Sequence, residues 1–268
     1  LREARWFGSR VRFEQLLLDQ GHIGRLDLSG RARLRGAYPL QASGSLDYLP
    51  FRAPGWGPVA VQLGGEVEHL DIGLTLAGKV SAHARGRLRP LEKALPYTAR
   101  LQWGDLALPW WSDHSIRSEG GRLAVTGDRQ GLQGSLDAQL SARHLPAGRY
   151  DLRGRTDWHS AAVSALGFKG LGGSLQAQGE VDWQAGLRWQ LSTRLAGIDL
   201  ARKWPVPRLA VPVLTGQFDS SGRTSAGGTD LKASLRLASG ERWQVEQRAA
   251  SWAWRLEQAQ QLTANWAG

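Results

Sequence analysis

The chain has 268 residues, of which 41% are hydrophobic, so it is long enough to bury a sizeable apolar interior. It contains no cysteine, which excludes disulfides and thiolate metal sites, and its longest apolar runs, such as 16–18 and 209–214, are too short to span a bilayer. The net charge is +10, but the basic residues are spread evenly without a run of five, which favours a solvated outer face over a nucleic-acid or anionic-lipid surface.

The N-terminal part of the chain carries the weakest patterns. There is no methionine, even at position 1, so we interpret the chain as a piece of a longer protein whose signal peptide or membrane anchor lies outside it. Residues 10–19 have some helical spacing. Breaks are expected at 50–58, 108–119 and 203–212, and because the strand pattern resumes after each, we interpret them as crossovers within one stack.

Most of the chain alternates apolar and polar residues with a period of two, which predicts strands with one apolar and one wet face. The clearest case is the pair 174–183 and 187–195, whose short Gly-containing link predicts an antiparallel hairpin. A short turn of helix is expected at 257–263. The other predicted strands are 80–88, 97–101, 136–142, 150–158, 231–237 and 252–256.

The chain also repeats itself. Residues 80–88 match 175–183 in pattern, and each copy continues into a second strand, an Asp-Leu pair and a Trp/Pro break. The repeats lie at about 70–111, at about 171–205 and, more weakly, from about 231. Stacked repeats place their apolar faces on one side. We therefore expect residues 1–268 to form a single elongated all-β segment, a curved and mostly antiparallel sheet with an apolar concave groove.

The sequence contains no convincing catalytic motif. The stretch Gly73 to Val80 nearly matches a phosphate-binding loop, but Val80 stands where a metal-binding Ser or Thr is required and the flanks alternate like strands. Glu180 and Asp182 fall on the predicted wet face, where a solvated charge is the simpler interpretation. The six histidines are scattered along the chain. We predict that the chain is not an enzyme and has no cofactor and no metal site.

Residues 171–222 resemble the repeat of TamB proteins, which belong to the AsmA-like group. The matching stretches are 172–183, 187–200, the Trp204-Pro205 break and 214–222. The resemblance implies a folded-over sheet called a β-taco, in an inner-membrane-anchored protein that spans the periplasm. It also implies a role in phospholipid movement to the outer membrane, and in assembly of outer-membrane β-barrel proteins with a TamA-like partner that binds parts outside this chain.

The residues are compatible with binding of acyl chains. A groove of Leu, Ala, Val and Trp removes each methylene from water, which is worth about 0.8 kcal/mol. Alternatively, the same side chains close on one another as an ordinary sandwich core; the repeats and the 13 tryptophans favour the open groove. The predicted phospholipid-binding groove consists of Leu136, Ala138, Leu140, Leu152, Trp158, Leu175, Val181, Trp183, Leu187, Trp189, Leu191 and Leu195.

Two other functions compete with the lipid conduit. A scaffold or chaperone for outer-membrane proteins would pair its exposed strand edges with a client strand. A closed sandwich or barrel would bind carbohydrate through Trp platforms on its outer face. Trp158, Trp183, Trp189 and Trp254 are instead in phase with the aliphatic residues, which argues against the carbohydrate hypothesis.

Overall fold

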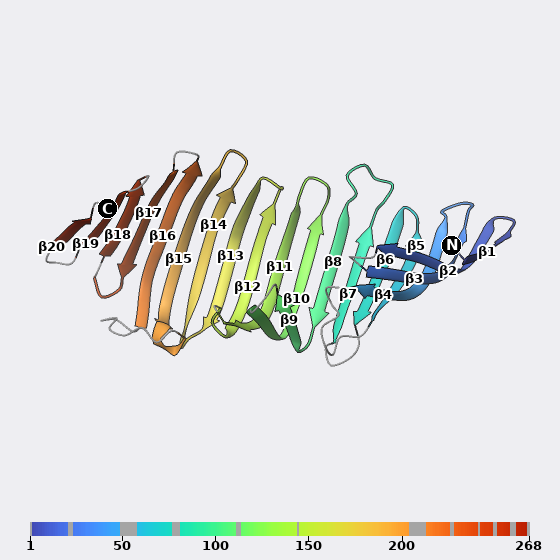
Figure 1. Ribbon diagram of the computed structural model, residues 1–268, viewed down its shortest axis with the longest axis horizontal. Helices are drawn as coiled ribbons and strands as arrows, with labels where there is room; N and C mark the ends of the chain where they lie inside the picture. The colour runs from blue at the N-terminus through green and yellow to red at the C-terminus, as the bar shows by residue number, and fades with distance from the viewer. Residues whose placement is uncertain are drawn as a thin grey trace. The chain divides into compact units, whose positions relative to one another are not determined.

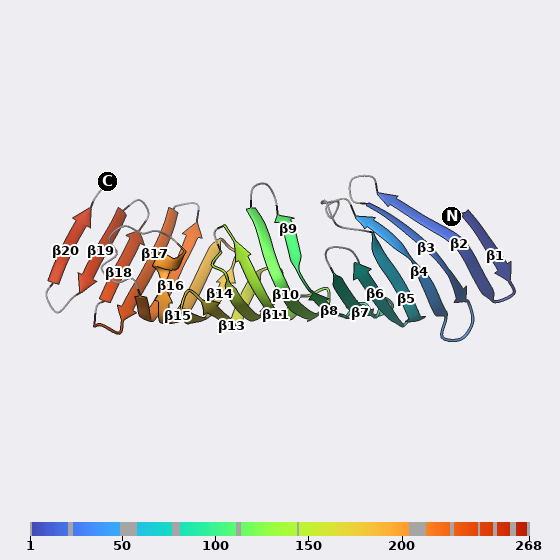
Figure 2. The same ribbon diagram turned by 90° about the horizontal axis from the view of Figure 1, so that it is seen from below.

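The computed structural model describes residues 2–20, 24–48, 58–76, 81–110, 114–143, 145–203, 213–225, 228–240, 242–248, 251–257 and 261–266. Residue contacts divide the chain into two compact units, Leu1–Leu132 (unit 1) and Gln133–Gly268 (unit 2), and each is considered by itself. Both units are built from strands (Figures 1 and 2). Within the residues named above, the 3-10 turn η2 (Leu200–Arg202) is the one helical element.

Unit 1 is an antiparallel sheet in which consecutive strands pair from β1 to β8. The long strand β10 then pairs with β8 along one part of its length and with β9 along another. Its strands are β1 (Arg2–Phe7), β2 (Arg10–Gln20), β3 (Gly24–Arg33), β4 (Pro39–Tyr48), β5 (Val59–Glu66), β6 (His69–Leu76), β7 (Ala82–Leu88), β8 (Tyr97–Trp103), β9 (Leu106–Trp110) and β10 (His114–Gly127).

Unit 2 is a second antiparallel run in which each strand from β12 to β20 pairs with the next. Strand β11 is the sheet neighbour of β12. The strands are β11 (Leu132–Ala142), β12 (Gly148–Thr156), β13 (Ser160–Gly170), β14 (Gly173–Asp182), β15 (Leu187–Asp199), β16 (Val213–Ser225), β17 (Gly228–Leu237), β18 (Arg242–Arg248), β19 (Ser251–Glu257) and β20 (Gln261–Trp266).

The strand register sorts the side chains of each unit onto two faces. Residues directly opposite in an antiparallel pair point to the same face. In unit 2, Phe168 lies opposite Leu175, which lies opposite Leu195. The same rule in unit 1 aligns Leu46 with Val59 and Val59 with Leu76. Apolar residues therefore share one face in each unit, and the expected all-β, antiparallel, curved sheet is confirmed.

The helical expectation for residues 10–19 is wrong, because this segment forms strand β2. The pairing of β2 with β3 shifts register between Phe13 and Leu16. A bulge of this kind adds a residue to one strand. It leaves the two apolar side chains three positions apart, a spacing that imitates a helix turn in the sequence.

Other expectations about the connections are also corrected. The helical turn at 257–263 is contradicted by strands β19 and β20, which hold the described residues of that stretch. Most of the break at 108–119 is strand, with Pro109 inside β9. Strand β9 pairs with β10, and Pro109 lies opposite Ser115 in this pairing. The other two breaks lie outside the described residues, apart from positions 58 and 203.

The two repeats contain similar strands but differ after them. Asp105 and Leu106 lead into strand β9, whereas Asp199 caps η2 by accepting a hydrogen bond from the Ala201 N–H. The hairpin of β14 and β15 forms as expected, with Gly186 at a φ of 103° in its turn. The single elongated segment and its internal repeats remain a prediction.

Asp157 organises the turn between β12 and β13. Its Oδ1 accepts hydrogen bonds from the Ser160 hydroxyl at 2.8 Å, the Ser160 N–H at 2.8 Å and the His159 N–H at 3.2 Å. These donors, the Ser160 hydroxyl first, lower the pKa of the Asp157 carboxyl from its ordinary value of 3.8. A carboxylate with a depressed folded-state pKa stabilises the fold above its unfolded pKa, and this contribution is lost as pH falls through the folded pKa.

We therefore expect Asp157→Ala to lower the melting temperature at neutral pH. The difference from the unmodified chain should shrink as the pH drops below the ordinary aspartate range and close in strong acid. Thermal unfolding followed by circular dichroism across pH measures this. A difference that stays constant into strong acid would show that the carboxylate charge does not hold the turn.

Candidate functional site: the apolar face of unit 2

Strands β11 to β17 have one mostly polar and one mostly apolar side. We call the second of these the apolar face of unit 2. Arg149 on β12 pairs with Asp137 on β11 at 2.8 Å, so these two side chains share the polar face. Ala138 is one position from Asp137, and Leu152 is three positions from Arg149. Because side chains alternate along a strand, Ala138 and Leu152 lie on the opposite face. From β12 onward the strand register extends this apolar face strand by strand to β17.

The structure places ten of the twelve predicted groove residues on strands of this one face. Leu136, Ala138 and Leu140 lie on β11, Leu152 on β12, Leu175 and Val181 on β14, and Leu187, Trp189, Leu191 and Leu195 on β15. Trp158 and Trp183 lie just beyond β12 and β14, in turns. Trp158 has a φ of 72°, so the strand predicted to reach it ends at Thr156 instead.

The two ends of the apolar face differ in exposure. At the end near the β13–β14 turn, Phe168 is 5% and Ile198 4% exposed; together with Tyr150 and Leu237 we call this the closed end. At the opposite end Leu187 and Trp183 are each 43% exposed, and Trp158 is 55% exposed. These three residues form what we call the Trp end. The face thus passes from packed side chains to an accessible apolar edge.

The two tryptophans of the Trp end are held together by a hydrogen bond. The Trp183 Nε1–H donates to the Trp158 backbone carbonyl at 2.8 Å, which joins the β12–β13 turn to the β14–β15 turn. Trp combines a large apolar body with one polar N–H, so satisfying that N–H leaves the ring free for apolar contact. The hydrogen bond therefore fixes the polar atoms of the Trp end, while its apolar ring atoms stay exposed.

Glycines are interspersed with larger apolar residues on the face between its two ends. Across four neighbouring strands, Gly154, Val163, Gly179 and Leu191 lie opposite one another in turn. The ring of Trp189 lies over Gly222, where an added Cβ would meet ring atoms. The Trp189 Nε1–H donates to the Ser220 hydroxyl oxygen at 3.2 Å. This part of the face is a low floor, because glycine carries no side chain to fill it.

The packing does not have the signature of a filled sandwich core. No large side chain among the described residues is fully buried, and Leu191 in the middle of β15 remains 37% exposed. Two sheets packed face to face bury their facing side chains completely. The observed exposure supports an accessible apolar face, although the predicted groove role of the twelve residues stays a prediction.

Sequence reasoning missed the contribution of β13, which supplies Ala161, Val163, Leu166 and Phe168 to this face. The register shifts between Val163 and Leu166, so the apolar residues change phase within the strand. A bulge of this kind hides a strand from a strict period-two search. The detectable signal is two short alternating runs that are out of phase by one residue.

No other chemistry is assembled in the described part of the chain. Within it, no group of three or more His, Asp or Glu side chains is placed to hold a metal ion. Gly73 lies inside β6, so the described part of the near-match to a phosphate loop is strand. No helix in the described residues is long and apolar enough to cross a membrane.

The fold defines an all-β protein, and its unit 2 carries an accessible apolar face. The family model of the TamB N-terminal domain matches residues 1–244, and the chain therefore belongs to the TamB family. The predicted TamB-like identity is confirmed. At the level of the family, this supports a role in outer-membrane assembly and lipid transport in the periplasmic cell envelope. No curated protein and no solved structure matches the chain.

Proposed function

We propose that the apolar face of unit 2 binds the acyl chains of phospholipids and serves as part of a conduit between the inner and outer membranes. The observation that carries the proposal is the row of apolar residues that strand pairing places on one face from β12 to β17, across the bulges, with an exposed Trp end. The chain acts here as a binding surface and not as an enzyme.

The energetics suit a ligand that binds and slides. Each acyl methylene that leaves water for this face gains about 0.8 kcal/mol, and the gain is non-directional. Because successive strands present similar apolar rows, a chain shifted by one strand finds nearly the same environment. The phosphate and glycerol groups stay in water beyond the Trp end. Binding is then strong in total while each step along the sheet meets a small barrier.

Native mass spectrometry of the purified chain, followed by lipid extraction, tests the proposal. We expect phospholipid to co-purify and to account for the mass added to the folded chain. A folded chain that is free of lipid, and stays so after incubation with phospholipid micelles, contradicts the conduit. In that case a client strand added in solution distinguishes the alternative scaffold role, because backbone pairing needs no acyl chain.

A further inference from the structure

Four arginines form a square on the polar face of unit 1. Arg12 on β2 lies directly opposite Arg31 on β3, and Arg10 lies opposite Arg33. All four side chains are exposed and point to one face, because they alternate with Val11 and Ala32 on the other. Like charges directly opposite each other destabilise a strand pair. Two such pairs side by side therefore destabilise the pairing of β2 with β3, which indicates a role for these arginines other than stability.

In the described part of the chain, the charges of this arginine square are not paired with carboxylates. None of the described carboxylates forms an ion pair with any of the four, although Glu14 pairs with Arg5 at 3.7 Å and Asp71 with Arg87 at 2.9 Å nearby. The Arg31 Nε and Nη2 donate instead to the neutral Gln41 Oε1, at 3.1 and 2.6 Å. The amide orients this guanidinium without cancelling its charge.

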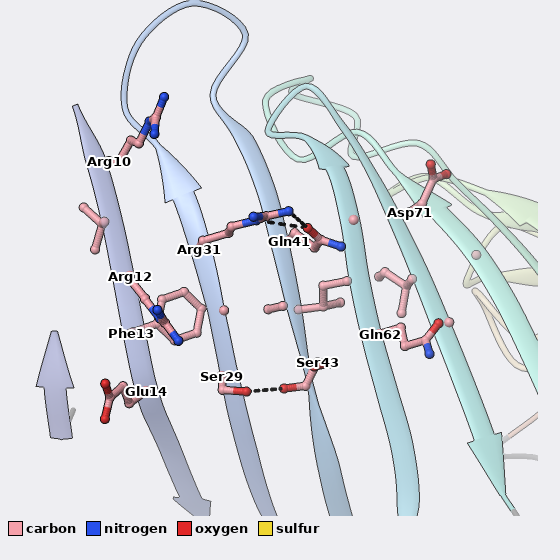
Figure 3. A pocket seen from close by; sticks show the side chains of 18 of the residues that line it. Arg10, Arg12, Phe13, Glu14, Ser29, Arg31, Gln41, Ser43, Gln62 and Asp71 are labelled. Atoms are coloured by element: carbon pink, nitrogen blue, oxygen red, sulfur yellow. Dashed lines mark hydrogen bonds between the residues drawn. The ribbon is translucent and has the colours of Figure 1, made fainter. Parts of the chain in front are cut away.

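The arginine square borders a hollow of about 1230 Å³ on this face (Figure 3). Arg10, Arg12 and Arg31 line it, and Ser29, Ser43 and Gln62 from three strands add polar groups. Gly64 lies opposite Gln41 and Gly73 opposite Gln62, so both glycines are on this polar face and leave room there because they carry no side chain. The hollow thus combines uncompensated cations, hydrogen-bonding side chains and room for a ligand.

We propose that this hollow binds a phosphate group. The planar guanidinium donates two parallel hydrogen bonds to phosphate oxygens, and two arginines facing each other can share one phosphate between them. A bound phosphate converts the unfavourable Arg12–Arg31 pairing into a favourable one. The site lies on the face opposite the apolar residues of its own unit, so it does not rest on the acyl-chain binding proposed for unit 2.

An exposed aromatic ring favours a lipid as the source of the phosphate. Phe7 on β1 lies opposite Arg10, lines the same hollow and is 64% exposed. An apolar ring beside a basic cluster matches the boundary between phosphate head groups and acyl chains. A free phosphate ion gains nothing from Phe7, so this residue separates the two sources.

Unit 2 provides a matched control for the arginine square. Arg188 and Arg223 also face each other on the polar side of their strands. There, however, Arg223 pairs with Asp230 at 2.9 Å, and Arg188 lies opposite Asp182. The double variant R188Q/R223Q therefore removes the same charge as R12Q/R31Q from a surface where carboxylates already compensate it.

The test measures co-sedimentation of the whole chain with vesicles at low ionic strength, and its thermal stabilisation by inorganic phosphate. Vesicles of phosphatidylcholine with phosphatidylglycerol should bind the unmodified chain, R12Q/R31Q should weaken this at least about tenfold, and R188Q/R223Q should change it less than about twofold. R12Q/R31Q should also melt higher than the unmodified chain without phosphate, which confirms that it folds.

The two arms identify the source of the phosphate. Loss of vesicle binding in Phe7→Ala, with phosphate stabilisation unchanged, assigns the site to a lipid head group. Stabilisation by inorganic phosphate that requires Arg12 and Arg31, without vesicle binding, assigns it to a free anion. Equal binding by the two double variants, or no response of the unmodified chain in either arm, overturns the site.

Discussion

Leu191→Asp should abolish phospholipid co-purification while the sheet stays folded. Leu191 is 37% exposed and lies between Gly179 on β14 and Ser220 on β16, so a carboxylate there remains hydrated when the face is empty. An acyl chain lying across this floor would have to strip that water away. Burying an unpaired charge costs several kcal/mol, so we expect lipid occupancy to fall at least about a hundredfold.

The neighbouring residue supplies the control. Gln190 is exposed on the polar face of the same strand, and Gln190→Asp adds the same charge without touching the apolar floor. It should leave lipid binding unchanged, as measured by native mass spectrometry alongside circular dichroism for both variants. If Leu191→Asp folds and keeps its lipid, the conduit is excluded; if it unfolds, the face is closed as a core.

Strand prediction was best where no bulge interrupts the alternation. From Gly173 to Asp182 the chain alternates without interruption, and β14 follows it residue by residue. Strand β13 escaped prediction because its bulge at Ser164 and Ala165 reverses the phase, and β2 was misassigned for the same reason. Period-two analysis assumes that each residue advances the pleat by one step. A single inserted residue is enough to break that assumption.

The partners of each residue were beyond the reach of local pattern analysis. Nothing near Arg12 in the sequence shows that it faces Arg31, because cross-strand pairing depends on the turn length and register between them. The same holds for the hydrogen bond from Trp183 to Trp158, which joins residues far apart in the chain. Alternation identifies which side chains share a face, whereas register decides which of them meet.

Phe168→Ala should cost about 3 kcal/mol of unfolding free energy, the usual range for removing a buried aromatic ring. Phe168 is 5% exposed, and its ring centroid lies 4.8 Å from that of Tyr150. An added Cβ at either Gly148 or Gly170 would meet the ring, so the ring covers both glycines. Its removal would leave a cavity over bare backbone at the closed end, and a urea denaturation midpoint measures the loss.

The exposed Phe7 provides a control for the loss of stability expected from Phe168→Ala. Phe7 is 64% exposed in unit 1, so Phe7→Ala should change stability by no more than about 0.5 kcal/mol, as at other surface sites. A large difference between the two variants means that aromatic packing fixes the closed end of the apolar face. If both variants lose equally little, the strands are held by backbone pairing alone, and the apolar face has no packed end.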